Sequence, residues 1–232
     1  MGHPYRNPRH RIVAMLACAS LATGIALATE RPTVDLRTTP TVHGNALAGA
    51  GKTAVCAACH GADGNAVVPQ FPNLAGQSAT YLYVQLQAFK AGWRSNAVMQ
   101  GQAAALGEQD MRDIAAYYAT LAPKAAPPSA TGSRGSRLFH AGDPALGIPA
   151  CQACHGPDGR GPRLDPASTA PQPAWASFPA LAGQHADYVL AQLKAFHDGT
   201  RGGSSNTEVM HGVVANLGEA DMQALATYIA GM

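Results

Sequence analysis

Two short motifs hold the residues with the most specific chemistry in this sequence. They are Cys56-Ala-Ala-Cys59-His60 and Cys151-Gln-Ala-Cys154-His155. Two thiols three residues apart lie on one helical turn and can bond both vinyl groups of a single haem, so the histidine that follows lies beneath the iron as an axial ligand. The motifs therefore predict two covalently bound haem c groups, with His60 and His155 as iron ligands.

Three other uses of the cysteine pairs explain less of the sequence. A disulfide within one pair would close a strained and very small loop, and it would leave the following histidine unexplained. Both pairs together could form a four-sulfur zinc site, but that site also needs no histidine. A thioredoxin-like motif would follow a strand, whereas the residues before Cys56 have a helical pattern. Covalent haem is therefore the interpretation we adopt.

The two motifs are parts of a longer repeat. Three matched blocks stand at offsets of 95, 107 and 111 residues: 56–61 with 151–156, 71–77 with 178–184, and 106–111 with 217–222. The offset grows by 12 within the Pro-rich stretch 160–175 and by 4 around 202–205, which are insertions of the kind that surface loops tolerate. The chain therefore contains a duplicated domain.

Apolar spacing within each copy is helical. One stripe is formed by Leu82, Leu86, Phe89 and Trp93, and its counterpart by Val189, Leu193 and Phe196. A last helix is expected to begin after Gly107, and to bury Met111, Ile114, Tyr118 and Leu121, matched by Met222, Leu225 and Ile229. A third helix should lead into each cysteine pair, near Ala46–Ala57 and Arg134–His140. No segment alternates as a strand, so we expect an all-α protein of two tandem domains, each wrapping one haem.

The N-terminus has the pattern of an export signal, with basic residues, then an apolar run from Ile12, then Ala26-Leu27-Ala28. We expect residues 1–28 to be cleaved, with an uncleaved anchor and lipidation at Cys18 as alternatives. The remaining boundaries are an irregular segment 29–44, a first domain 45–122, a linker 123–133 and a second domain 134–232. Lys and Arg number 16 against 14 Asp and Glu, so charge gives no argument for nucleic-acid binding.

Each copy offers two matched methionines as the second axial ligand of its iron. Met111 and Met222 fall on the buried stripe of the last helix, where methionine commonly fills a core. Met99 and Met210 are expected in the irregular segment between helices, where the backbone can aim sulfur at iron. We therefore assign Met99 and Met210 as ligands. His211 is a rival at the second site, but its counterpart is Gln100.

From about residue 45 to residue 232 the sequence resembles the class I c-type cytochromes and, among them, the dihaem cytochrome c4 family. The resemblance rests on residues 56–64, on the repeated Phe-Pro-x-Leu-Ala-Gly-Gln and Gln-Leu-x-Ala-Phe blocks, and on Gly-Ile-Pro-Ala-Cys at 147–151. It implies two cytochrome c folds related by a pseudo-twofold axis, with haem propionates near the domain interface. It also implies a periplasmic electron donor to a terminal oxidase, often associated peripherally with the membrane.

The resemblance also implies roles for matched residues. Pro72 and Pro179 would accept the Nδ1 proton of the haem-ligating histidines through their carbonyls, and Leu74 and Leu181 would pack on the haems. Propionate contacts are implied for Gln77, Gln184, Tyr81, Tyr188, Arg94 and Arg201, with simple solvation as the alternative. The sequence departs from the family at Trp93 and in the insertion 160–175.

The function expected from these features is outer-sphere electron transfer between redox protein partners, without an enzymatic reaction. One alternative is a cytochrome subunit that accepts electrons from a dehydrogenase complex. A dihaem peroxidase is a second alternative, but it requires an open iron site, and matched methionine ligands argue against that.

Overall fold

The computed structural model describes residues 1–2, 33–38, 42–126, 128–162 and 173–232. The chain divides into residues 1–30 and a compact unit, Arg31–Met232. Apart from residues 1 and 2, the predicted signal peptide, with Cys18, lies outside the described residues. In the described part of Arg31–Met232, strand-like pairing is limited to two isolated bridges, Val34 with Ser204 and Asp143 with Ile148. The predicted all-α class is confirmed.

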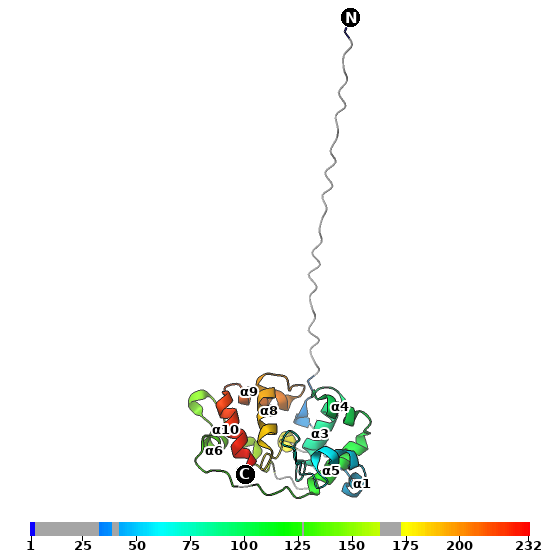
Figure 1. The fold of residues 1–232 in the computed structure, drawn as a ribbon, viewed down its shortest axis with the longest axis vertical. Coiled ribbons are helices and arrows are strands. Elements are labelled where there is room, and N and C mark those ends of the chain that lie inside the picture. The colour runs from blue at the N-terminus through cyan, green and yellow to red at the C-terminus, as the bar shows by residue number, and fades with distance from the viewer. Residues whose placement is uncertain (3–32, 39–41, 127, 163–172) are drawn as a thin grey trace. The chain divides into compact units, whose positions relative to one another are not determined.

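The first copy of the repeat is built from five α-helices after a short 3-10 helix. These elements are η1 (Leu36–Thr38), α1 (Ala46–Ala50), α2 (Ala54–His60), α3 (Ala79–Lys90), α4 (Ala97–Ala104) and α5 (Glu108–Thr120). They gather on one side of the Arg31–Met232 unit, in the blue to green part of the ribbon (Figure 1).

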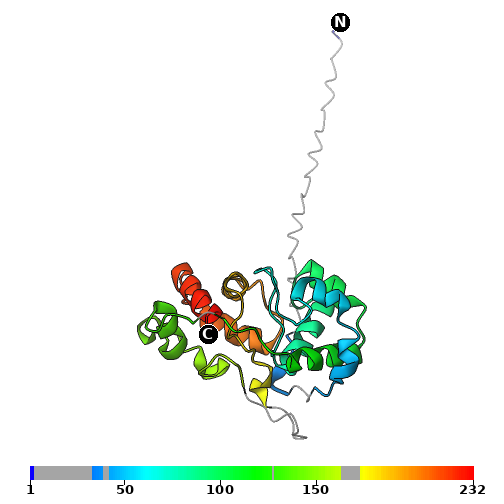
Figure 2. The same cartoon turned by 60° about the horizontal axis from the view of Figure 1, so that its bottom comes forward.

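The second copy repeats this order with an added turn. Its elements are α6 (Arg134–Ala141), η2 (Pro144–Leu146), α7 (Gln152–His155), η3 (Ala174–Ser177), α8 (Ala186–His197), α9 (Ser205–Val214) and α10 (Glu219–Ala230). Helices α6, α8, α9 and α10 lie together on the other side of the unit, and the separation of the two groups is also visible in Figure 2.

Each copy has its own hydrophobic core around its last helix. In the first copy α5 packs on α1 and α3, and buries Met111, Ile114 and Tyr118. In the second copy α10 packs on α6 and α8, and buries Met222, Leu225 and Ile229. These last helices begin after Gly107 and Gly218, and acids in their first turns favour the helix dipole, as the sequence predicted.

A matched glycine lets two helices cross closely in each copy. A Cβ on Gly49 of α1 would lie 2.1 Å from the carbonyl oxygen of Asp113, and a Cβ on Gly135 of α6 would lie 2.1 Å from that of Ala224. Asp113 and Ala224 are matched positions of the repeat, 111 residues apart. The same backbone contact therefore fixes the first helix of each copy against the last one, and only glycine permits it.

The approach to each cysteine pair differs from the prediction. The expected helix 46–57 is two helices, because α1 ends at Ala50, where the Thr53 hydroxyl donates a hydrogen bond to the Ala50 carbonyl. In the second copy the expected helix 134–140 is confirmed as α6, which ends at Ala141, but residues 142–150, with η2, separate it from Cys151. The helical periodicity identified apolar positions, but it could not show that side chains would interrupt the helix.

Two further expectations need correction. Trp93 does not extend the apolar stripe of α3, because that helix ends at Lys90 and Trp93 lies in the turn after it. The segment 29–44 is not irregular throughout, since it contains η1 and the bridge from Val34 to Ser204.

Candidate haem sites

Helix α2 carries the chemical groups of the first motif. Cys56 and Cys59 are free thiols, and His60 is 6% exposed at the end of the helix. The carbonyl oxygen of Pro72 lies 2.9 Å from Nδ1 of His60. The ring of Phe71 packs edge-on against the imidazole, with 6.2 Å between ring centroids. The loop after the motif therefore holds the histidine ring in one orientation.

The second motif has the same arrangement on α7. Cys151 and Cys154 are free thiols, His155 is 7% exposed, and its Nδ1 lies 2.9 Å from the carbonyl oxygen of Pro179. The described residues contain no cluster of three or more His, Cys, Asp or Glu side chains that could hold a metal ion. The two cysteine pairs are thus not gathered into the four-sulfur site that a shared zinc ion would need.

The hydrogen bonds to proline fix the protonation of both histidines. A carbonyl oxygen can only accept, so Nδ1 carries the proton and Nε2 keeps a free lone pair. Burial lowers the pKa of His60 and of His155, and this effect exceeds the opposing effect of the proline carbonyls. Both rings are therefore neutral at pH 7, the state in which imidazole binds a metal.

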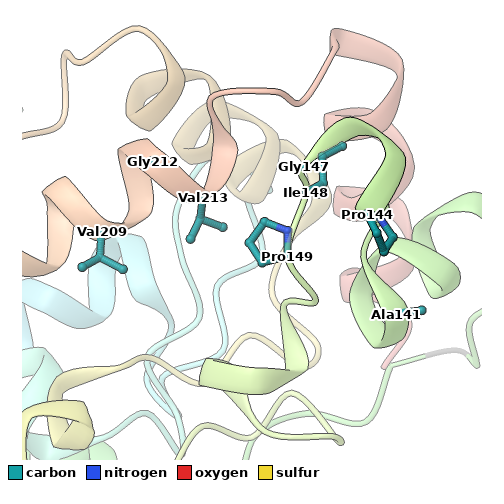
Figure 3. Close-up of a pocket in the computed structure, with 8 residues that line it drawn as sticks. All are labelled: Ala141, Pro144, Gly147, Ile148, Pro149, Val209, Gly212 and Val213. Atoms are coloured by element: carbon teal, nitrogen blue, oxygen red, sulfur yellow. The ribbon is translucent and has the colours of Figure 1, made fainter.

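A cleft of about 530 Å³ opens beside the second motif. One wall is the segment that leads into Cys151, with Ile148 and Pro149, and the other is α9, with Val209 and Val213 (Figure 3). The lining is almost entirely apolar. Such a cleft suits a mostly apolar group held between α9 and the segment that precedes Cys151.

The methionines lie in helices, which corrects the predicted position of two of them. Met99 is in the first turn of α4, where its N–H donates to the Asn96 side chain, and Met210 is inside α9. Both are half-buried. Met111 and Met222 are each 4% exposed and belong to the two cores, as the sequence predicted. The error arose because residues 96–104 and 205–214 lack an obvious apolar stripe.

The other residues predicted around the haems are also placed. Leu74 and Leu181 are partly buried against the first and second core, respectively. His211 is exposed on α9, with its Nδ1 2.7 Å from the carbonyl oxygen of Phe196.

Two glutamines join the copies reciprocally. The side chain of Gln77 donates to the carbonyl of Ala180 and accepts from its N–H, each at 2.9 Å. The side chain of Gln184 makes the same two bonds to Asn73, at 3.0 and 2.8 Å. Because Gln184 and Ala180 are the counterparts of Gln77 and Asn73, these four bonds obey a pseudo-twofold relation.

Two arginines meet at the same interface. Arg94 donates to the Tyr188 hydroxyl and to Gln192, both at 2.8 Å, while Arg201 donates to the Tyr81 hydroxyl at 3.0 Å. Arg201 is 8% exposed, and its Nε is buried without a hydrogen-bond partner. In the described part of the chain, every side-chain hydrogen bond from these guanidinium groups goes to a neutral oxygen.

Burial together with two like charges perturbs this arginine pair. Burial lowers the pKa of Arg201, and the charge of Arg94 lowers it further. Burial raises the pKa of Tyr81, but the positive charges of Arg201 and Arg94 outweigh that effect and bring the pKa below its usual value. The interface therefore concentrates positive charge in a poorly solvated place, which an anionic group would stabilise.

The comparisons with known proteins match these features. The cytochrome c family model matches residues 44–122 and again 132–232. Cytochrome c4 of Pseudomonas aeruginosa is 43% identical over 82% of this chain and 89% of its own length. The chain belongs to the cytochrome c4 family.

One solved structure and one protein with a different name are also similar to this chain. The crystal structure of reduced recombinant cytochrome c4 from Pseudomonas stutzeri matches with a TM-score of 0.73 and 40% identity, over 82% of this chain and 100% of that one. A thiosulfate dehydrogenase electron acceptor of Thiomonas intermedia is 40% identical, over 77% of this chain and 79% of its own length. The resemblance inferred from the motifs is confirmed.

As a cytochrome c4, the protein is an electron-transfer protein with two covalently bound haem c groups, which confirms the predicted cofactor. The chain's own residues fit that group. Each motif offers two unpaired thiols and one neutral imidazole with a free Nε2 lone pair, and an apolar cleft adjoins the second motif.

Gln85 and Gln192 also lie at this interface, a role that was not predicted for them from the sequence. Gln85 accepts from Arg94 at 2.7 Å and Gln192 accepts from Arg201 at 2.7 Å, so both belong to the arginine cluster. A signal was present, because both begin the repeated Gln-Leu-x-Ala-Phe block of this cytochrome c4. Their spacing on the helix could not show that these polar faces would meet.

Proposed function

We propose that the protein carries single electrons between redox proteins in the periplasm, with both haem irons held by histidine and methionine. The ligands would be His60 and Met99 in the first copy and His155 and Met210 in the second. Cys56 and Cys59, and likewise Cys151 and Cys154, would form the thioether bonds. A haem iron with two strong axial ligands exchanges one electron without changing its ligands, and methionine raises its reduction potential.

The observation that carries this proposal is the matched hydrogen bond from each histidine to a proline carbonyl. Both bonds are 2.9 Å long, and both leave the imidazole neutral with Nε2 free. The chain therefore presents two equivalent, oriented nitrogen ligands. A hydrogen bond from Nδ1, the nitrogen that does not bind the metal, fixes the orientation of the imidazole ring. It also increases the basicity of Nε2 as a metal ligand. This gives Pro72 and Pro179 their role beside the haems, where Leu74 and Leu181 would pack.

The choice of methionines rests on where the four candidates lie. Met111 and Met222 are committed to the two cores, so releasing either would leave a cavity. Met99 and Met210 are half-buried on α4 and α9, and α9 forms the wall of the cleft opposite the segment before Cys151. His211 is disfavoured at the second site, because its Nδ1 bonds to Phe196 and the first copy has Gln100 at that position.

The arginine pair at the interface supports a place for the haem propionates. Arg94 and Arg201 come from different copies, and in the described residues their side chains find only neutral hydrogen-bond acceptors. Haem propionates directed toward this interface would supply the missing negative charge. Gln77 and Gln184 take no part in this proposal, because both side chains are engaged with the backbone of the other copy.

The location and the boundaries complete the proposal. Residues 1–28 would direct export, after which the chain would consist of the N-terminal segment 29–44, the haem domains 45–122 and 134–232, and the linker 123–133. None of the helices among the described residues is long and apolar enough to cross a membrane. The resemblance to cytochrome c4 favours peripheral association with the membrane, with an uncleaved anchor or lipidation at Cys18 as the alternatives.

Two kinds of partner are consistent with this role. A respiratory donor and a terminal oxidase follow from the likeness to cytochrome c4. A dehydrogenase as donor is favoured by the relative named as a thiosulfate dehydrogenase electron acceptor, which is nearly as similar. We propose the first arrangement, with the second as the alternative. Two separate rates distinguish them. In the first arrangement the reduced protein should be oxidised rapidly by a terminal oxidase, and the oxidised protein should be reduced only slowly by thiosulfate dehydrogenase with thiosulfate. Rapid reduction by thiosulfate dehydrogenase would favour the alternative.

Paired methionine variants test the ligation. Met99→Ala should leave one haem high-spin with a lowered potential, whereas the control Met111→Ala should keep both haems low-spin and cost about 2–5 kcal/mol of unfolding free energy. A low-spin Met99→Ala protein would contradict the assignment. Carbon monoxide binding to the reduced native protein would contradict closed coordination and would favour the peroxidase alternative.

A further inference from the structure

The segment Thr33–Thr38, which we call the N-terminal strap, contacts both copies at once. Val34 donates through its N–H to the carbonyl of Gly203 at 3.0 Å, and its carbonyl accepts from the N–H of Ser205 at 2.9 Å. The N–H of Leu36 donates to the Ser205 hydroxyl at 3.0 Å. The side chain of Leu36, however, is 7% exposed and belongs to the core of the first copy.

The strap meets two features that the repeat does not explain. Residues 202–205 contain the four-residue insertion found in the second copy, and they are the residues to which Val34 and Leu36 bond. Trp93, the residue at which the first copy departs from the family pattern, lies directly against the insertion. A Cβ on Gly203, whose φ is +91°, would come 2.8 Å from the Cβ of Trp93. Three unusual features of the sequence therefore form one contact.

This contact lies next to the arginine pair. Val34, Leu36, Trp93 and Gly203 line a cavity of about 20 Å³ together with Arg94 and Arg201. A cavity of this size holds about one water molecule. The strap thus lies beside both arginines, of which Arg201 is 8% exposed and Arg94 is half-buried. It also lies before residue 44, where the match to the cytochrome c family begins.

We propose that the N-terminal strap is a clasp that holds the two haem domains in one relative arrangement and thereby positions them for electron transfer between the haems. Domains joined by a modest polar interface move relative to each other by default. Electron transfer between two centres falls steeply with their separation, so an open interface would slow it. The claim about the transfer rate rests on the proposed function, whereas the claim about closure does not.

The test uses the full-length protein with both haems bound. Val34→Pro removes the N–H that bonds Gly203 and keeps Leu36 in the core of the first copy. The matched control is Asp35→Ala, which breaks the exposed ion pair with Arg37 in the same strap. Closure is measured by the rate at which phenylglyoxal labels Arg201, with exposed Arg137 as the internal reference.

We expect Val34→Pro to label Arg201 about fivefold faster, the factor that one lost hydrogen bond gives to an opening equilibrium. Labelling of Arg137 should not change, and Asp35→Ala should behave as the unmodified protein. The rate of electron transfer between the haems after flash reduction should fall in Val34→Pro, while each haem keeps its absorption spectrum.

Two results would overturn the clasp: unchanged labelling of Arg201, or faster labelling with an unchanged transfer rate. If Val34→Pro does not fold, Ser205→Ala takes its place, because it removes the hydroxyl that accepts from the N–H of Leu36. Phenylglyoxal should then label Arg201 faster in Ser205→Ala than in the unmodified protein. Absence of electron transfer between the haems in the unmodified protein would contradict the proposed function instead, and the labelling would still test closure.

Discussion

Arg201 of the second copy donates a hydrogen bond to the hydroxyl of Tyr81 in the first, 120 residues earlier in the chain, at 3.0 Å. Arg94 makes the mirrored bond to Tyr188 at 2.8 Å. Helices α3 and α8 carry the two tyrosines of this interface, and each arginine lies in the turn that follows one of these helices. One buried and one half-buried cation at the join of the two domains favour anionic propionates there, and they make the interface sensitive to any change in charge.

Removing either tyrosine hydroxyl should weaken the interface. Tyr81→Phe and Tyr188→Phe each remove one acceptor from a guanidinium that keeps its bonds to Gln85 and Gln192. Because a hydrogen bond to a charged group is lost, each variant should lower the free energy of unfolding by about 2 kcal/mol. Urea unfolding followed by circular dichroism measures this loss. Tyr117→Phe, a half-buried tyrosine of α5, is the control and should stay within about 0.5 kcal/mol of the unmodified protein. Unequal losses from the two mirrored tyrosines would show that the pseudo-twofold relation does not extend to their energetics.

Gln77→Glu should open the interface in a pH-dependent way. The substitution keeps the acceptor for the Ala180 N–H, but at neutral pH it places a second oxygen against the Ala180 carbonyl. We expect a loss of about 3 kcal/mol at neutral pH, because a buried charge is left facing an acceptor. The loss should shrink at acid pH, where the protonated side chain can donate. Urea midpoints across this pH range measure it, and a loss independent of pH would contradict this explanation.

Pro72→Ala should leave the haem spectrum unchanged. The atom that accepts the His60 proton is a backbone carbonyl, which alanine also supplies. The variant should lose only about 0.5–1 kcal/mol of unfolding free energy, because the unfolded chain gains freedom when proline is removed. Pro69→Ala, at an exposed position nearby, is the matched control. A high-spin haem in Pro72→Ala would show that the proline ring itself, and not its carbonyl, holds the ligand.

Asp113 should make the first copy sensitive to acid. Its carboxylate accepts from Lys52, from the N–H of Asn45 and from Gln109, which together lower its pKa from 3.8 to about 2. Because the pKa is lower in the folded protein, this contribution to stability is present above about pH 4 and is lost as the pH falls toward 2.

Asp113→Asn should therefore be less stable at pH 7 and should lose less further stability between pH 4 and pH 2. Thermal unfolding midpoints measured across this window test the prediction. Glu208→Gln, which changes an exposed acid in α9, should keep the acid response of the unmodified protein. An identical response in Asp113→Asn would assign the acid sensitivity to other groups.

The sequence alone determined the features that depend on residues close together in the chain, namely the haem attachment motifs and the helices with a regular apolar spacing. The thiols and imidazoles of Cys56–His60 and Cys151–His155 specified covalent haem, because that chemistry needs only one helical turn. Apolar spacing located α3, α5, α8 and α10, and the repeat showed that the same fold occurs twice. Burial of Met111 and Met222 followed from the same periodicity.

Tertiary structure decided what depends on residues far apart in the chain. The bonds of Arg201 to Tyr81 and of Gln77 to Ala180 join residues more than 100 positions apart, and they exist only because two polar helix faces and two loops meet. The contact of the strap with residues 202–205 is of the same kind. Spacing along a helix determines which side chains share a face, but only packing determines what that face contacts. For this reason the haem ligation motifs could be recognised in the sequence, while the interface and its clasp became visible only in the structure.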